Sequence, residues 1–150
     1  MTLVIRRLSL DEMDRVALLH RASFDARLPW LAGLHTPEED RAFFREHVYP
    51  NSVVHGAFEG AALLGFMALR ASWIDQLYVA PGQQGRGIGS RLIALAKAAS
   101  PRLQLWTFQR NAGARRFYEH HGFVAVETRD GSDNEEREPD ICYRWEGTWS

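Results

Sequence analysis

Residues 77–100 read LYVAPGQQGRGIGSRLIALAKAAS. An apolar, strand-like run comes first, three glycines follow within five positions (Gly85, Gly87 and Gly89), and apolar residues at helical spacing then begin. Glycine inside a helix or strand costs about 0.5–1 kcal/mol relative to alanine, because it loses more backbone freedom on folding. A turn with so many glycines therefore predicts that something approaches its bare backbone closely.

A strand that leads through a glycine turn into a helix points several backbone N–H groups at one place, which favours binding of an anion such as phosphate. A P-loop is excluded, because no lysine follows Gly87. A dinucleotide-binding turn would need an acidic residue about 20 positions later, and LQLWTFQRN (residues 103–111) supplies none. A turn that serves packing alone remains a structural alternative.

Length and charge narrow the class of protein. A chain of 150 residues with 45% apolar composition fits one globular domain over residues 1–150. Lysine and arginine total 18 against 19 acidic residues, so we expect neither a nucleic-acid partner nor a membrane surface. Cys142 is the only cysteine and is expected to be inert core. Without a signal-like apolar segment, the chain is expected to be cytoplasmic.

The periodicity of the chain predicts a mixed α/β (α+β) domain in the order β-α-α-β-β-β-α-β-α-β-β. Two capping boxes, Ser9 with Glu12 and Thr36 with Glu39, mark the starts of the first two helices. The second helix is expected to end near Val48, before Tyr49-Pro50. Between them, residues 25–35 (DARLPWLAGLH) read as a loop rich in apolar side chains. A β-hairpin turn is expected at Glu59-Gly60.

Two motifs carry a resemblance to a known family. Residues 84–89 (QGRGIG) resemble the Gln/Arg-x-x-Gly-x-Gly/Ala motif of the GNAT superfamily of N-acetyltransferases. Residues 111–123 (NAGARRFYEHHGF) resemble the second signature of that family. The resemblance implies a mixed, mostly antiparallel sheet of about seven strands with four helices. It also implies acetyl transfer from acetyl-CoA to a primary amine by direct attack in a ternary complex, with no metal.

The same resemblance implies which residues hold acetyl-CoA. The glycine turn would bind the pyrophosphate, and a strand splayed from its neighbour would pair with the pantetheine arm through free backbone groups. Asn111 would contact that arm, and it is also well suited to cap the following helix; the two roles are compatible. The cofactor-binding residues implied in this way are Leu77, Tyr78, Val79, Gln84, Gly85, Arg86, Gly87, Ile88, Gly89, Ser90 and Asn111.

Two residues are candidates for proton transfer. Tyr118 matches the tyrosine near the cofactor sulfur in many relatives, where a phenol can protonate the leaving thiolate; a half-buried core tyrosine is the structural alternative. Asp75 lies on the strand before the glycine turn and is a candidate general base, directly or through water. It can equally be a solvated carboxylate, and the reaction can also proceed without a dedicated base.

The acceptor side is the least defined part of the sequence. Apolar Phe24, Trp30 and Leu31, with Glu135 and Glu136 in an acidic loop, favour a small cationic amine. A solvated hairpin tip is the structural alternative for the acidic loop. Homodimers are common in this family, so the resemblance allows a homodimer, but the sequence does not decide the oligomeric state. The alternative function is a catalytically silent acyl-CoA sensor or interaction module on the same fold.

Overall fold

The computed structural model describes residues 2–147. Seven strands form one sheet: β1 (Val4–Arg7), β2 (Val53–Glu59), β3 (Ala62–Arg70), β4 (Trp73–Val79), β5 (Arg102–Phe108), β6 (Val124–Arg129) and β7 (Asp140–Glu146). The helices are α1 (Met13–Arg27), α2 (Pro37–Phe43), α3 (Tyr49–Asn51), α4 (Ile88–Ala99) and α5 (Ala112–His120). Short 3₁₀ turns η1 (Leu10–Glu12) and η2 (Pro29–Leu31) and a π-helical turn η3 (Phe44–Val48) complete the elements.

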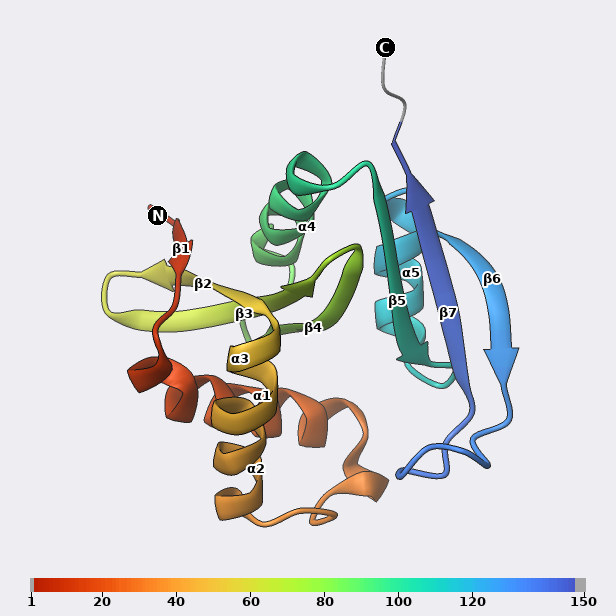
Figure 1. Cartoon of the computed structure of the whole chain (residues 1–150), viewed down its shortest axis with the longest axis horizontal. Coiled ribbons are helices and arrows are strands. Elements are labelled where there is room, and N and C mark those ends of the chain that lie inside the picture. Colours follow the sequence, from red (N-terminus) through yellow and green to blue (C-terminus); the bar gives the residue numbers. More distant parts are fainter. Residues whose placement is uncertain (1, 148–150) are drawn as a thin grey trace.

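The strand order is β1-β2-β3-β4-β5-β7-β6, and the neighbours are antiparallel except for the parallel pair β4 and β5. In Figure 1, β2 to β4 run across the picture whereas β5 to β7 run from top to bottom, so the sheet opens between β4 and β5. The predicted fold class is confirmed: the sheet is mixed and mostly antiparallel, and four helices accompany it. The elements α2, η3 and α3 follow one another without a break and count as one of these four helices.

Alternation along β3 divides the core into two layers. Met67 and Leu69 pack on one face with α4, whereas Phe66 and Ala68 pack on the other face with α1 and η3. Gly65 on β3 allows α4 to approach closely, since a Cβ there would lie 2.9 Å from Ile88 Cγ2. Helices therefore cover both faces of the sheet, and the glycine turn before α4 is held against it.

Local signals placed the helix starts correctly. The Ser9–Glu12 capping box opens η1, which leads into α1, and the Thr36–Glu39 capping box opens α2. Two expected boundaries were wrong. α1 continues through residues 25–27, and helical turns continue to Asn51, because Pro50 occupies the first turn of α3, where no N–H donor is needed. Among residues 2–147, no helix is long and apolar enough to cross a membrane.

Candidate active site

The cleft begins where β4 and β5 part. In the described chain the two strands share one register pair, Trp73 with Gln104, and the Gln104 N–H donates to the Ser72 carbonyl at 2.9 Å. Further along, β4 pairs only with β3, up to Val79 opposite Gly65. One backbone edge of Leu77 to Val79 therefore faces an open gap, which agrees with the expectation that this strand separates from its neighbour. Such an edge can pair with an extended ligand.

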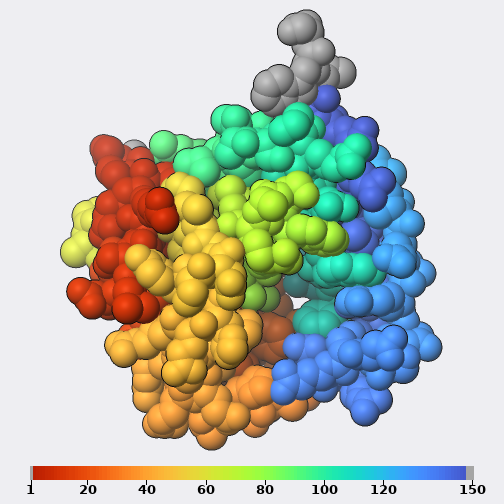
Figure 2. Space-filling view, in the orientation of Figure 1, coloured from red at the N-terminus to blue at the C-terminus, as the bar shows by residue number. Residues whose placement is uncertain are grey.

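A cavity of about 1020 Å³ fills this gap. α1 and α2 form one wall, β4 and β5 form the back, and the glycine turn and α5 form the other wall. Figure 2 shows an opening in this face of the molecule, between the blue β6–β7 segment and the orange α1–α2 segment. The cavity is large enough for a cofactor arm and an acceptor to meet.

The glycine turn forms one end of the cavity. Gly85 and Gly87 have φ angles of 80° and 79°, which side chains with a Cβ adopt only at a cost. Within the part of the chain that the structure describes, no atom of another segment lies within 4 Å of a Cβ built on either residue. Gln84 braces the turn, because its amide oxygen accepts from the Gly82 N–H at 3.0 Å. Open space in front of a helix N-terminus is the environment that a pyrophosphate needs.

Ile88 and Gly89 begin α4, and both line the cavity. Ser90 also lines it, with its hydroxyl 3.0 Å from Nε2 of His121. Arg86 differs from the other residues of the turn: its guanidinium donates to Glu59 at 2.9 Å and to Gln83, and it is not among the lining residues. The structure therefore places all of the turn except Arg86 against the cavity.

Two candidate residues lie at the N-cap and in the last turn of α5. The Asn111 side chain accepts from the Ala114 N–H at 3.2 Å, so its helix-capping role is present, and Asn111 also lines the cavity. Tyr118 lines the cavity and is 7% exposed. Burial first, and then the nearby Tyr78 phenol, raises the pKa of Tyr118 well above its usual value of 10. The phenol therefore stays protonated at ordinary pH and can act only as a proton donor.

Asp75 lines the cavity, but its carboxylate is already engaged. Arg70, at the end of β3, donates to both carboxylate oxygens, at 2.8 and 3.1 Å. The ion pair orients Asp75 toward the β3–β4 turn. Proton removal by Asp75 would therefore need an intervening water. The sequence had allowed Asp75 to act as a base either directly or through water.

The acceptor-side residues separate into two groups. Phe24, Glu135 and Glu136 line the cavity, whereas Trp30 and Leu31 do not. Trp30 instead donates its indole N–H to Glu138 at 2.5 Å. Trp30 therefore contacts the β6–β7 loop and not the cavity.

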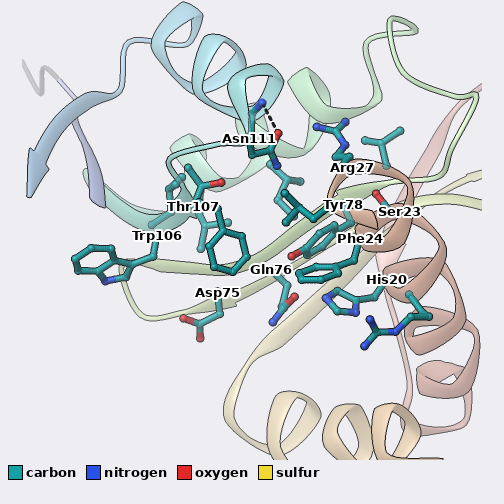
Figure 3. A pocket seen from close by; sticks show the side chains of 18 of the residues that line it. His20, Ser23, Phe24, Arg27, Asp75, Gln76, Tyr78, Trp106, Thr107 and Asn111 are labelled. Carbon is teal, nitrogen blue, oxygen red and sulfur yellow. Dashed lines mark hydrogen bonds between the residues drawn. The ribbon is translucent and has the colours of Figure 1, made fainter. Parts of the chain in front are cut away.

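Sequence reasoning missed three polar side chains in this region: His20, Ser23 and Gln76, all of which line the cavity (Figure 3). Each has a buried side-chain atom that finds no hydrogen-bond partner among residues 2–147: His20 Nδ1, Ser23 Oγ and Gln76 Oε1. A polar residue on the apolar face of the first helix was a detectable signal for His20. For Gln76, the direction of the side chain depends on how β4 pairs with its neighbouring strands, so the local sequence held no such signal.

Comparison with known proteins identifies the class. The model of the acetyltransferase (GNAT) domain matches residues 50–125, just over half of the chain. The chain therefore belongs to the GNAT family of acetyltransferases, which confirms both the predicted family and the predicted enzyme class, an N-acetyltransferase.

Two curated relatives are peptidyl-lysine N-acetyltransferases. The chain is 34% identical to YiaC of Escherichia coli over 70 residues, which cover 46% of this chain and 48% of YiaC. The match to that relative thus spans about half of its length. The chain is 27% identical to YjaB of Salmonella typhimurium over 124 residues, which cover 82% and 84% of the two chains.

Solved structures support the same fold. Apo YjaB from Escherichia coli superposes with a TM-score of 0.82 at 25% identity, covering 99% of this chain and 100% of that one. The PaiA N-acetyltransferase of Thermoplasma acidophilum, solved in complex with coenzyme A, has a TM-score of 0.69 at 20% identity, with 97% and 100% coverage. At that identity the second likeness concerns the fold alone.

Proposed function

We propose that this chain is a single-domain enzyme over residues 1–150 that transfers the acetyl group of acetyl-CoA to a primary amine. The observation that carries the proposal is the gap between β4 and β5 beyond Trp73 and Gln104, which ends at the open turn of Gly85 and Gly87. An exposed strand edge suits the amide-containing pantetheine arm, and the turn suits the pyrophosphate. The cytoplasmic location expected from the sequence is part of this proposal.

In the proposed reaction, the uncharged amine attacks the thioester carbonyl while both substrates are bound. A C–N bond forms, the C–S bond breaks, and the Tyr118 phenol gives its proton to the departing sulfur. The proton lost by the amine leaves through water, with Asp75 as the candidate base. Holding both reactants in one cavity supplies much of the rate gain, because attack then no longer requires a chance encounter.

The charge of the cavity supports an acceptor that arrives as a cation. Seven acidic side chains line it against three arginines: Glu39, Asp40, Glu46, Asp75, Glu135, Glu136 and Asp140 against Arg21, Arg27 and Arg129. An excess of negative charge raises the local concentration of a cationic ligand. The similarity to YiaC and YjaB, both peptidyl-lysine N-acetyltransferases, favours a lysine side chain as that cation, and a small cationic amine is the other candidate.

The test is CoA thiol release from acetyl-CoA with a panel of a lysine peptide, spermidine and an aminoglycoside, alongside direct measurement of acetyl-CoA binding. Turnover with one amine class supports the enzyme and names its acceptor. Tight acetyl-CoA binding with no turnover on any amine would instead support the silent acyl-CoA binder. Absence of acetyl-CoA binding would contradict both.

A further inference from the structure

Two side chains on the acceptor side of the cavity have no role in the scheme above. His20 comes from α1 and Gln76 comes from β4, and both line the cavity. In Figure 3 the two side chains point toward one another across the space between α1 and β4, close to Phe24 and Tyr78. They come from segments 56 positions apart in the chain, so only the fold brings them together.

Both side chains have a hydrogen-bonding atom that nothing else in the described chain uses. Nδ1 of His20 and Oε1 of Gln76 are buried without a partner. Native proteins pair almost all such atoms, and each exception needs an explanation. Two unpaired polar atoms at one cavity are explained by a ligand that offers several N–H groups there. Ser23, one turn along α1, has an unpaired buried hydroxyl in the same wall.

The surroundings keep His20 neutral. Its ring packs against three aromatic rings, with distances between ring centroids of 4.6 Å to Tyr78, 5.3 Å to Phe44 and 5.7 Å to Phe24. Burial, followed by the charge of Arg21, lowers the pKa of His20 to about 4, although Asp40 and Asp25 oppose this. A neutral imidazole has one nitrogen lone pair that can accept a hydrogen bond and does not repel a cationic ligand.

We propose that His20 and Gln76 bind the nitrogen of the acceptor amine by accepting its N–H hydrogen bonds. This inference rests on the proposed function and names the residues that recognise its second substrate. A primary ammonium has three N–H donors, which is enough to pair with both side chains at once. A protonated tertiary amine has only one N–H donor. The pair therefore favours ammonium groups with at least two N–H donors, as a primary amine has, and the acidic side chains around it supply the attraction for positive charge.

The test uses substitutions that remove each acceptor while retaining most of the volume, His20→Leu and Gln76→Met. With the amine of the panel that gives the highest wild-type turnover, each should raise KM for the amine about tenfold or more, as expected for a lost hydrogen bond to a charged group. The Kd of acetyl-CoA should stay within about twofold of wild type. His20→Asn and Gln76→Glu keep an acceptor and should raise KM less than His20→Leu and Gln76→Met do.

His55→Leu is the matched control. His55 also has a buried Nδ1 without a partner, but it lies on β2 and does not line the cavity. Its substitution should leave KM for the amine unchanged. Wild-type turnover with unaltered KM in both His20→Leu and Gln76→Met would overturn this inference alone. Absence of turnover by the wild-type protein on every amine would overturn the proposed function, and this inference with it.

Discussion

Trp30 donates its indole N–H to the carboxylate of Glu138, a residue 108 positions away, at 2.5 Å. Arg110 adds a second contact to Glu138 at 3.3 Å, and its guanidinium lies 4.6 Å from the centre of the Trp30 ring. Nearby, Nε2 of His35 lies 3.0 Å from Glu135. These contacts join the segment between α1 and α2 to the β6–β7 loop, whose Glu135 and Glu136 line the cavity.

Trp30→Phe should lower the free energy of unfolding by about 1–3 kcal/mol, because the buried Glu138 carboxylate loses a donor. It should also raise KM for the amine, since the loop that contains Glu135 and Glu136 is then less firmly held. Urea unfolding and steady-state kinetics measure the two effects. Glu127→Gln, at an exposed position on β6, is the control and should change neither. Unaltered stability in Trp30→Phe would show that the hydrogen bond does not hold the loop.

Gly87→Ala should weaken acetyl-CoA binding in addition to destabilising the fold. A residue with a Cβ at φ 79° costs about 1–2 kcal/mol. Gly60→Ala is a matched control, because Gly60 also has a positive φ (59°) and open space around a built Cβ, but lies in the β2–β3 hairpin. Calorimetric titration should show weaker binding only for Gly87→Ala. Equal binding by the two variants would remove the glycine turn from the proposed cofactor site.

Tyr118→Phe should lower kcat about a hundredfold or more, the size typical of a lost general acid, while acetyl-CoA still binds. Because the pKa of Tyr118 is raised above 10, this phenol should cause no fall in the wild-type kcat below about pH 10. Tyr143→Phe is the comparison: Tyr143 is also buried, but its hydroxyl donates to Glu119, away from the cavity lining. If both variants lose kcat equally, the effect is structural.

The stability of the protein should fall between about pH 6.5 and pH 4 partly through His20. Its pKa is near 6.5 when unfolded and about 4 when folded. The unfolded chain therefore takes up a proton in this range and the folded chain does not, so unfolding becomes more favourable as the pH falls. The contribution reaches up to about 3 kcal/mol. Urea unfolding of His20→Leu should show a shallower decline with falling pH than wild type; parallel curves would contradict the neutral state of His20.

Glu135→Gln with Glu136→Gln should raise KM for a cationic amine, most strongly at low ionic strength, because exposed charges act over about 10 Å at 0.1 M salt. Steady-state kinetics at two salt concentrations measures this. Asp133→Asn, in the same loop but not among the residues that line the cavity, is the control. An unchanged KM in the double variant would exclude the acidic loop from acceptor binding.

Most of the fold was predictable because its signals are local. Capping boxes, glycine turns and the change of period from helical to alternating depend on neighbours in the chain, and they placed nearly every element. The two boundary errors lie at residues 25–27 and at Pro50, where the helical structure continues past residues that the local signals assigned to a loop or to a helix end. The proposed cofactor side could be predicted for the same reason, since one continuous segment, residues 77–90, contains most of the residues proposed to bind acetyl-CoA.

The residues of the proposed acceptor side could not be predicted from local signals, because they come from α1, α2, β4, β5 and the β6–β7 loop. Trp30 and His20 illustrate the difference. The sequence favoured Trp30 for the pocket and did not single out His20, whereas the fold directs Trp30 to Glu138 and His20 toward Gln76. The sequence by itself determined the family, the order of the elements and the glycine turn, through short-range backbone preferences. Only the tertiary structure decided which polar atoms remain unpaired in the cavity, because burial and pairing depend on contacts between distant segments.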